Sequence, residues 1–339
     1  MNPSGIYYDP IGHWVVVVIA MLLLVFVLLT AAAYTVWFER VLLGRFQARP
    51  GPNRVGPYGL MQLAADGVKL IFKESFIPSG VDRFTYLLAP GIAVAAALLS
   101  WAVIPVGLWF GFYYWIADIN IGILLIFAIG AMNVYAIMLG GYSSNSKYSL
   151  LGGLRAGAQL ISYEVALGLS LVPVFMIVGS LRLQDIADFH LHLGGYSGPF
   201  PLLLLAPLSF LIYMIAAVAE TNRAPFDLPE AEQELTGGFL TEYSGAKFVM
   251  FYLAEYLNMI AQAALVTVLF LSAWWLPWPI PPVLGFFVKV VFVLFLFIWL
   301  RATLPRLRYD MLMRLSWKLL LPLGILNVVV TAVMVVALS

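Results

Sequence analysis

Long hydrophobic stretches alternate with polar stretches along all 339 residues of the chain. A helix that crosses a bilayer needs about 20 consecutive, predominantly apolar residues. Eight segments meet this length, so the pattern predicts spans near residues 14–37, 84–108, 119–140, 156–179, 201–219, 248–273, 284–300 and 318–337. No internal repeat or long polar linker divides the chain. The pattern therefore predicts an all-α polytopic membrane protein in which residues 1–339 form a single membrane domain.

Basic residues are concentrated on one side of these predicted spans. The odd-numbered connections, at 38–83, 141–155, 220–247 and 301–317 with Lys318 at the end of the last, hold seven, two, two and five Lys or Arg residues. The opposite side holds only Arg182, while Lys289 lies inside the seventh span. Because short loops rich in Lys and Arg stay in the cytoplasm, the odd-numbered connections are predicted to be cytoplasmic and both termini to lie outside.

The first connection contains a predicted amphipathic helix. Gln62, Asp66, Lys69 and Lys73 follow each other at spacings of four, three and four residues, which places them on one stripe of a helix whose other faces are apolar. Such a helix lies at the membrane interface on the cytoplasmic side. Two interpretations stay open: the stripe faces a polar space that has a function, or it is simply solvated.

The fifth connection, residues 220–247, is long and acidic. It contains the six acids Glu220, Asp227, Glu230, Glu232, Glu234 and Glu242. A loop of this length without an obvious long helix is typically functional or disordered. The many apolar residues beside the acids argue against disorder. The alternative to a functional loop is an acidic loop that is only solvated.

Two carboxylates lie inside predicted spans, Glu164 in the fourth and Glu255 in the sixth. A charged side chain near the centre of a bilayer costs about 3 kcal/mol, so it normally faces a bundle interior and marks an ion or proton path. With a rise of 1.5 Å per residue, both lie roughly 10 to 13 Å from their predicted helix starts. Together with Glu220, at the end of the fifth span, they can form a descending proton path. The alternative is that each carboxylate hydrogen-bonds a neighbouring helix as a structural contact.

Composition excludes several classes of protein. With 63% hydrophobic and only 10% charged residues, the chain is far less charged than a soluble domain at about 25%. The net charge of +1 provides no basic field for nucleic acid. Without cysteine the chain can hold neither an iron–sulfur cluster on thiolates nor a thiolate zinc site. The positions of the three histidines, His13, His190 and His192, do not suit the axial ligands of a haem within the spans. A redox metal must therefore belong to a partner.

Several long motifs resemble one protein family. They occur in the family's order along nearly the whole chain: ER at 39–40, GPNRVGPYGL at 51–60, AD at 65–66, KLIFKE at 69–74, SSNSKYSLLGGLRAGAQLISYE at 143–164, AETNRAPFDLPEAEQEL at 219–235, AEY at 254–256 and RATLPRLRYD at 301–310. These motifs resemble the membrane-embedded H subunit of proton-pumping NADH:quinone oxidoreductase, or respiratory complex I, whose mitochondrial counterpart is NADH dehydrogenase subunit 1. Departures at Leu63, Met311 and Ser316 fall on the flanks of motifs.

The resemblance implies a function and two sets of site residues. It implies a subunit without a redox centre that helps form the quinone chamber and couples quinone reduction to proton translocation. By analogy the quinone passage is lined by Arg40, Asp66, Lys69, Arg301 and Arg306. The proton path would consist of Glu164, Glu220, Glu255, Asp227, Glu230, Glu232 and Glu234.

The resemblance also implies a location, partners and cofactors. The expected location is a bacterial-type plasma (inner) membrane. The expected partners are hydrophilic quinone-site and iron–sulfur subunits, small membrane subunits and lipid. Quinone is the substrate, no cofactor is held in this chain covalently or by metal ligation, and the iron–sulfur clusters and flavin belong to partner subunits.

Three other functions remain as alternatives. The first is the homologous subunit of a membrane-bound hydrogenase-type complex, which does not use NADH. The second is a stand-alone proton-coupled transporter with Glu164 and Glu255 as carriers, although such a protein would not need the long acidic connection or the basic seventh connection. The third is a structural anchor, which leaves the intramembrane carboxylates unexplained.

Overall fold

The computed structural model describes residues 10–109, 112–113, 116–193, 196–229, 236–275 and 280–338. Seven helices in this part of the chain are long and apolar enough to cross a membrane. They comprise α1 (Pro10–Phe46), α3 (Arg83–Leu99), α4 (Gly122–Ser143), α5 (Lys147–Val178), α10 (Ala246–Phe270), α11 (Pro282–Thr303) and the segment that ends in α13 (Leu321–Leu338). The predicted class, an all-α polytopic membrane protein, is confirmed.

The fifth predicted span is shorter than the others. It consists of α7 (Leu202–Leu205) and α8 (Pro207–Glu220), which has 14 residues. The break falls at Ala206, whose φ of −131° is not helical, because proline disfavours the helical conformation in the residue before it. At 1.5 Å per residue α8 is about 21 Å long, less than the roughly 30 Å of the hydrocarbon core. Its last residue is Glu220, so this carboxylate sits where the helix stops.

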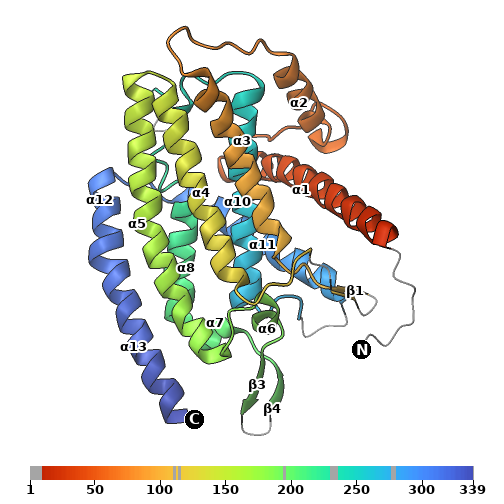
Figure 1. Ribbon diagram of the computed structural model, residues 1–339, viewed down its shortest axis with the longest axis vertical. Coiled ribbons are helices and arrows are strands. Elements are labelled where there is room, and N and C mark those ends of the chain that lie inside the picture. The colour runs from red at the N-terminus through yellow and green to blue at the C-terminus, as the bar shows by residue number, and fades with distance from the viewer. Residues whose placement is uncertain are drawn as a thin grey trace.

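Helix α10 is the centre of the bundle (Figure 1). It packs against α1, α3 and α11, and most of its residues are buried. Helices α4 and α5 pack against each other, and α13 lies along α5. In Figure 1 helix α1 leans away from the other helices. Its outward residues, such as Leu22 and Phe26, are more than half exposed, as expected of side chains that face lipid.

Helix α5 begins nine residues earlier than the hydropathy predicted, at Lys147 instead of 156. The polar, glycine-containing start of this helix packs closely against its neighbours. A Cβ atom on Gly152 would lie 2.7 Å from the backbone nitrogen of Phe239. Because packing continues the helix beyond its apolar part, Glu164 lies about 25 Å from the helix start, about twice the predicted distance.

Shorter elements lie at the two ends of the bundle. The amphipathic helix is α2 (Gln62–Phe72), and Lys73 is already extended and leaves the predicted stripe. Two antiparallel hairpins, not predicted, lie at the end opposite α2 (Figure 1). The remaining elements are α6 (Leu183–Ala187), α12 (Tyr309–Arg314), a π-helical turn (Leu315–Leu320), 3-10 turns (Pro57–Gly59, Ser100–Ala102, Gly238–Leu240) and the strands β1 (Leu108–Trp109), β2 (Phe112–Tyr113), β3 (His190–Leu193) and β4 (Tyr196–Pro199).

The lysine in the seventh predicted span has a structural partner. Lys289, on α11, donates hydrogen bonds from Nζ to the carbonyl oxygens of Leu271 and Trp275 at 2.5 Å and of Ala273 at 3.0 Å. These carbonyls follow the end of α10, where the last helical C=O groups lack partners within the helix. The ammonium group therefore caps α10, which explains why a lysine is tolerated in an apolar helix.

Candidate functional site

A buried carboxylate on α1 connects three distant parts of the chain. Glu39 is 2% exposed, and its carboxylate accepts hydrogen bonds from Arg223 Nη1 at 3.2 Å, from Tyr256 Oη at 2.8 Å and from Arg301 Nη1. The Arg223 guanidinium also lies 4.3 Å from the centre of the Tyr256 ring. One carboxylate thus joins α1 to the start of the acidic connection, to α10 and to the end of α11. We call these four residues the Glu39 cluster.

Glu39 was not among the site residues predicted from the sequence. It appeared only as part of the ER motif, directly before Arg40. The available signal was a carboxylate at the end of a long apolar run, which has a cost unless it is paired. Its two cationic partners lie 184 and 262 residues away in the sequence. Spacing within a helix or loop cannot reveal such a pairing.

A polar cavity adjoins the Glu39 cluster. It has a volume of about 90 Å³ and is lined by residues 222–224 and 227 of the acidic connection, by Tyr252, Glu255 and Tyr256 of α10, and by Arg301. We call it the loop cavity. Both Asp227 and Glu255 line it, so two carboxylates from different elements share this space with two arginines. By volume the cavity has room for about six water molecules.

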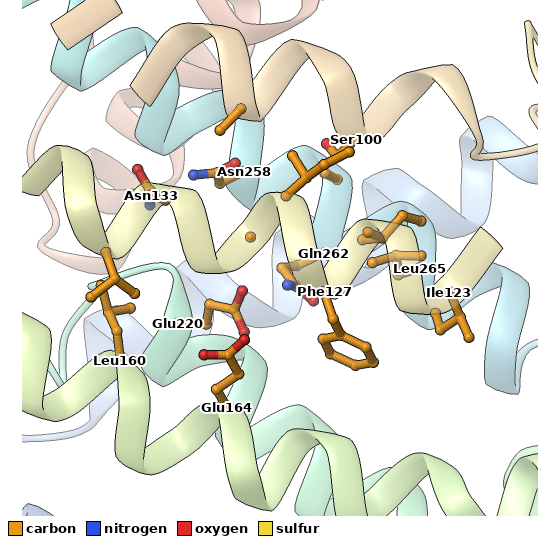
Figure 2. Close-up of a pocket in the computed structure, with 16 residues that line it drawn as sticks. Ser100, Ile123, Phe127, Asn133, Leu160, Glu164, Glu220, Asn258, Gln262 and Leu265 are labelled. Carbon is orange, nitrogen blue, oxygen red and sulfur yellow. The ribbon is translucent and has the colours of Figure 1, made fainter. Parts of the chain in front are cut away.

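A second cavity lies deeper among the helices (Figure 2). It has a volume of about 40 Å³, enough for about three water molecules. Figure 2 shows Glu164 of α5 and Glu220 of α8 with their carboxyl groups turned toward each other. The other polar residues of its lining are Ser100, Asn133, Asn258 and Gln262. We call this space the helix cavity.

The Glu220 side chain is tightly surrounded. Within the described part of the chain, its buried Oε2 atom has no hydrogen-bond partner. A Cβ atom on Gly130 of α4 would lie 3.3 Å from its Oε1 atom. Gln262 of α10 is fixed beside it by a 2.9 Å hydrogen bond from the Tyr213 hydroxyl. A carboxyl group in such a site is a candidate for proton exchange, because a buried polar atom without a protein partner has hydrogen-bonding capacity to spare.

The two cavities are neighbours along α10. Glu255 lines the loop cavity, and Asn258, three residues further on, lines the helix cavity. Three residues correspond to about 4.5 Å along a helix and to the same side of it. The structure therefore places Asp227 with Glu255 and Glu164 with Glu220, as two pairs of carboxylates in adjacent spaces. It does not place Glu164 and Glu255 in the same cavity.

The far end of the acidic connection is held by aromatic side chains. The rings of Tyr86 and Tyr243 stack with centres 4.2 Å apart, and the Tyr243 hydroxyl donates to the Tyr86 carbonyl oxygen at 3.2 Å. Burial raises the pKa of Tyr243 to about 12, so its hydroxyl stays protonated and remains a donor. Lys247 donates to the Phe76 carbonyl oxygen at 3.2 Å. The connection is thus fixed against the segment that follows α2.

The predicted quinone-passage residues fall into two groups. Arg40 pairs with Asp66 at 2.6 Å at the contact between α1 and α2. Burial raises the pKa of Asp66, but hydrogen bonds from Gln62 and Arg40 outweigh it and hold the pKa below the usual value. Lys69 is exposed on α2. The second group is Arg301, in the Glu39 cluster, and Arg306, whose neighbour Leu307 donates from its backbone nitrogen to the Pro225 carbonyl oxygen at 2.9 Å.

Three of the predicted acids, Glu230, Glu232 and Glu234, lie outside the described residues. Among the residues that the structure describes, no three His, Asp or Glu side chains are grouped as metal ligands would be.

These features define a class of protein: a polytopic α-helical membrane protein with buried carboxylates in polar interior cavities. Comparison with known proteins then identifies the family. The family model for NADH dehydrogenase matches residues 18–332, and the chain belongs to this family.

Individual relatives are similar over nearly the whole chain. The chain is 50% identical to the second H subunit of the NADH-quinone oxidoreductase of Syntrophobacter fumaroxidans, covering 93% of this chain and 95% of that protein. It is 51% identical to the H subunit of the NADH-quinone oxidoreductase of Thermomicrobium roseum, covering 90% and 92%. It is 49% identical to NADH-quinone oxidoreductase subunit 8 of Thermus thermophilus, covering 96% and 88%. The resemblance found in the sequence motifs is confirmed.

Proposed function

We propose that this chain is the membrane-embedded H subunit of an NADH:quinone oxidoreductase, that it helps form the quinone chamber, and that it couples quinone reduction to proton translocation. The observation that carries the proposal is the arrangement of buried charge. The Glu39 cluster, the loop cavity and the helix cavity follow one another from the end of α1 into the bundle. A structural anchor would not need two buried pairs of carboxylates beside polar cavities.

The Glu39 cluster is the proposed junction between quinone and proton path. Arg301 is proposed to line the quinone passage, and Arg223 begins the connection that carries Asp227. Both arginines are held by one carboxylate, with Arg223 only 8% exposed. In a poorly solvated site, a change of charge on one group is felt strongly by its neighbours because Coulomb energies rise as the effective dielectric falls.

The chemistry places specific tasks on the residues of this chain. Quinone becomes quinol by taking up two electrons and two protons; the electrons come from an iron–sulfur cluster in a partner subunit. The residues of the passage, Arg40, Asp66, Lys69, Arg301 and Arg306, would position the quinone head group. The change of charge on reduction would shift protonation first at Asp227 and Glu255, and then at Glu220 and Glu164. Glu230, Glu232 and Glu234 of the same connection belong to the proposed path.

Purification in mild detergent tests the proposed assembly. The chain should be isolated together with iron–sulfur proteins and a flavoprotein, and the preparation should reduce quinone with NADH. Isolation as a monomer or homo-oligomer would contradict the proposal and favour a stand-alone transporter. Isolation with iron–sulfur proteins and hydrogenase activity, but without NADH oxidation, would favour the hydrogenase-type complex.

The proposed orientation in the plasma membrane gives a separate prediction. The distribution of sixteen basic residues against one predicts that the connections containing residues 60, 150 and 240 face the cytoplasm. Reporter fusions after residue 60 should therefore give a cytoplasmic signal, and fusions after residue 339 an outer-side signal. A fusion after residue 182 serves as a second outer-side control. A cytoplasmic signal from the C-terminal fusion would contradict the orientation.

A further inference from the structure

The side-chain amide of Gln159 holds the first part of the acidic connection. Gln159 lies on α5, and its side chain is completely buried. Its Nε2 atom donates hydrogen bonds of 2.8 Å to the carbonyl oxygen of Ala219 and 2.8 Å to that of Phe226. The same atom is 3.3 Å from Asn222 Oδ1. One NH2 group thus closes residues 219–226 into a loop on the surface of α5.

The two carbonyl groups have a specific position in the chain. The Ala219 carbonyl belongs to the peptide unit directly before Glu220, and the Phe226 carbonyl belongs to the one directly before Asp227. Glu220 lines the helix cavity, whereas Asp227 lines the loop cavity. The amide therefore sets the position of one carboxylate of each cavity relative to the other. Its own helix carries Glu164 five residues further on.

We infer that Gln159 is a positioning residue that holds Glu220 and Asp227 at the separation needed for proton transfer between the two cavities. This inference rests on the proposed function. Proton transfer through hydrogen-bonded groups depends strongly on distance, and a misplacement of about 1 Å near a reacting group can cost on the order of a hundredfold in rate. An amide is suited to this task because it donates two hydrogen bonds and does not itself take up or release a proton.

The local structure allows this role to be separated from folding. The Ala219 carbonyl also accepts a hydrogen bond from the backbone nitrogen of Asn222 at 3.3 Å, and the Phe226 carbonyl accepts one from Leu228 at 3.0 Å. Both carbonyls therefore keep a partner when the amide is removed, and the large penalty for an unsatisfied buried group does not arise. Variants at Gln159 should release the loop while the bundle still assembles.

Two substitutions test the inference in the purified complex reconstituted into vesicles. Gln159→Met keeps the length and removes both donors. Gln159→Glu keeps the shape, but an ionised carboxylate donates no hydrogen bond and a protonated one donates a single bond. The control is Asn327→Asp: Asn327 is also a buried amide and donates to Ser209 Oγ at 2.7 Å between α13 and α8, away from both cavities.

Complex yield on native gels, quinone reduction and protons pumped per NADH are measured across the pH range of wild-type activity. We expect both Gln159 variants to assemble and to pump about tenfold more slowly than wild type. The activity of Gln159→Glu relative to wild type should rise toward acidic pH, because only the protonated side chain restores one of the bonds. The relative activity of Gln159→Met should stay flat, and Asn327→Asp should retain the wild-type pumping ratio.

Wild-type pumping by Gln159→Met would overturn the inference, as would equal losses in both variants without the change in pH profile, which would assign Gln159 to packing. If neither variant assembles, Gln159→Asn decides, since it keeps the donors but shortens the side chain by one methylene group: a normal pumping ratio contradicts the inference and a lowered one supports it. Inactive Glu220→Gln with normal Gln159 variants would refute only this inference. Full pumping by Glu164→Gln and Glu220→Gln would instead refute the proposed path.

Discussion

Glu164→Gln and Glu220→Gln are each expected to lower quinone-linked proton pumping by about a hundredfold, the lower range for the loss of a group that transfers protons. Glutamine has nearly the size of glutamate and still forms hydrogen bonds, but it cannot exchange a proton. Because the two side chains face each other in the helix cavity, either change interrupts the proposed path at the same place. Pumping and quinone reduction by the assembled complex in vesicles provide the measurement.

Matched substitutions separate proton transfer from packing at this site. Glu164→Asp should retain part of the activity because it keeps a titratable group. If Glu164 were only a contact between helices, the order would be reversed: glutamine would be tolerated, and the shorter aspartate would weaken assembly. Glu74→Gln, at an exposed position after α2, controls for the exchange itself. Complexes with Glu164→Gln and Glu220→Gln that assemble and pump like wild type would refute the path.

Glu39→Ala is expected to have the largest effect on assembly. Removing one partner of a buried ion pair typically costs about 3 to 5 kcal/mol, because the other charge is left buried and uncompensated. Here the loss would leave Arg223, which is 8% exposed, without its carboxylate and would release Arg301 from the same atom. We expect little assembled complex on native gels and a lower temperature of dissociation for the remainder.

An exposed ion pair one residue away on α1 is the matched comparison. Asp66→Asn breaks the pair with Arg40, whose side chains are 51% and 31% exposed in the order Arg40, Asp66. Exposed pairs contribute at most about 1 kcal/mol, so the yield of assembled complex should stay near that of wild type. The double variant Glu39→Gln with Arg301→Gln leaves one unpaired guanidinium instead of two and should recover part of the yield lost by Glu39→Gln. Normal assembly of Glu39→Ala would contradict the structural importance of the cluster.

The motifs predicted more of the site than their spacing could explain. The resemblance implied Arg301 as part of a quinone passage, and the structure shows that Arg301 contacts a carboxylate on a helix far away in sequence. Gln159 lies within one of the quoted motifs without any assigned role. Its three acceptors belong to a loop 60 to 67 residues later, so its role depends on how the connection folds back onto α5.

The predicted proton path was changed by helix boundaries. Glu164 and Glu255 were expected at similar distances from their helix starts, but α5 begins at Lys147 and places Glu164 much further along its helix. The structure accordingly puts the two residues in different cavities. Hydropathy reports where a chain can enter lipid, whereas the start of a helix also depends on packing by residues that are not apolar.

The sequence by itself determined that the chain crosses a membrane repeatedly, which segments do so, where the amphipathic helix lies and to which family the protein belongs. These conclusions depend on local properties, because hydrophobicity is summed over about 20 neighbouring residues and motifs are contiguous. Only the tertiary structure decided which carboxylates share a cavity, that Glu39 is held by Arg223 and Arg301, and that Gln159 connects two cavities. Those pairings join residues far apart in the chain, and their free energy comes from burial, which depends on how the helices pack and which no stretch of sequence contains alone.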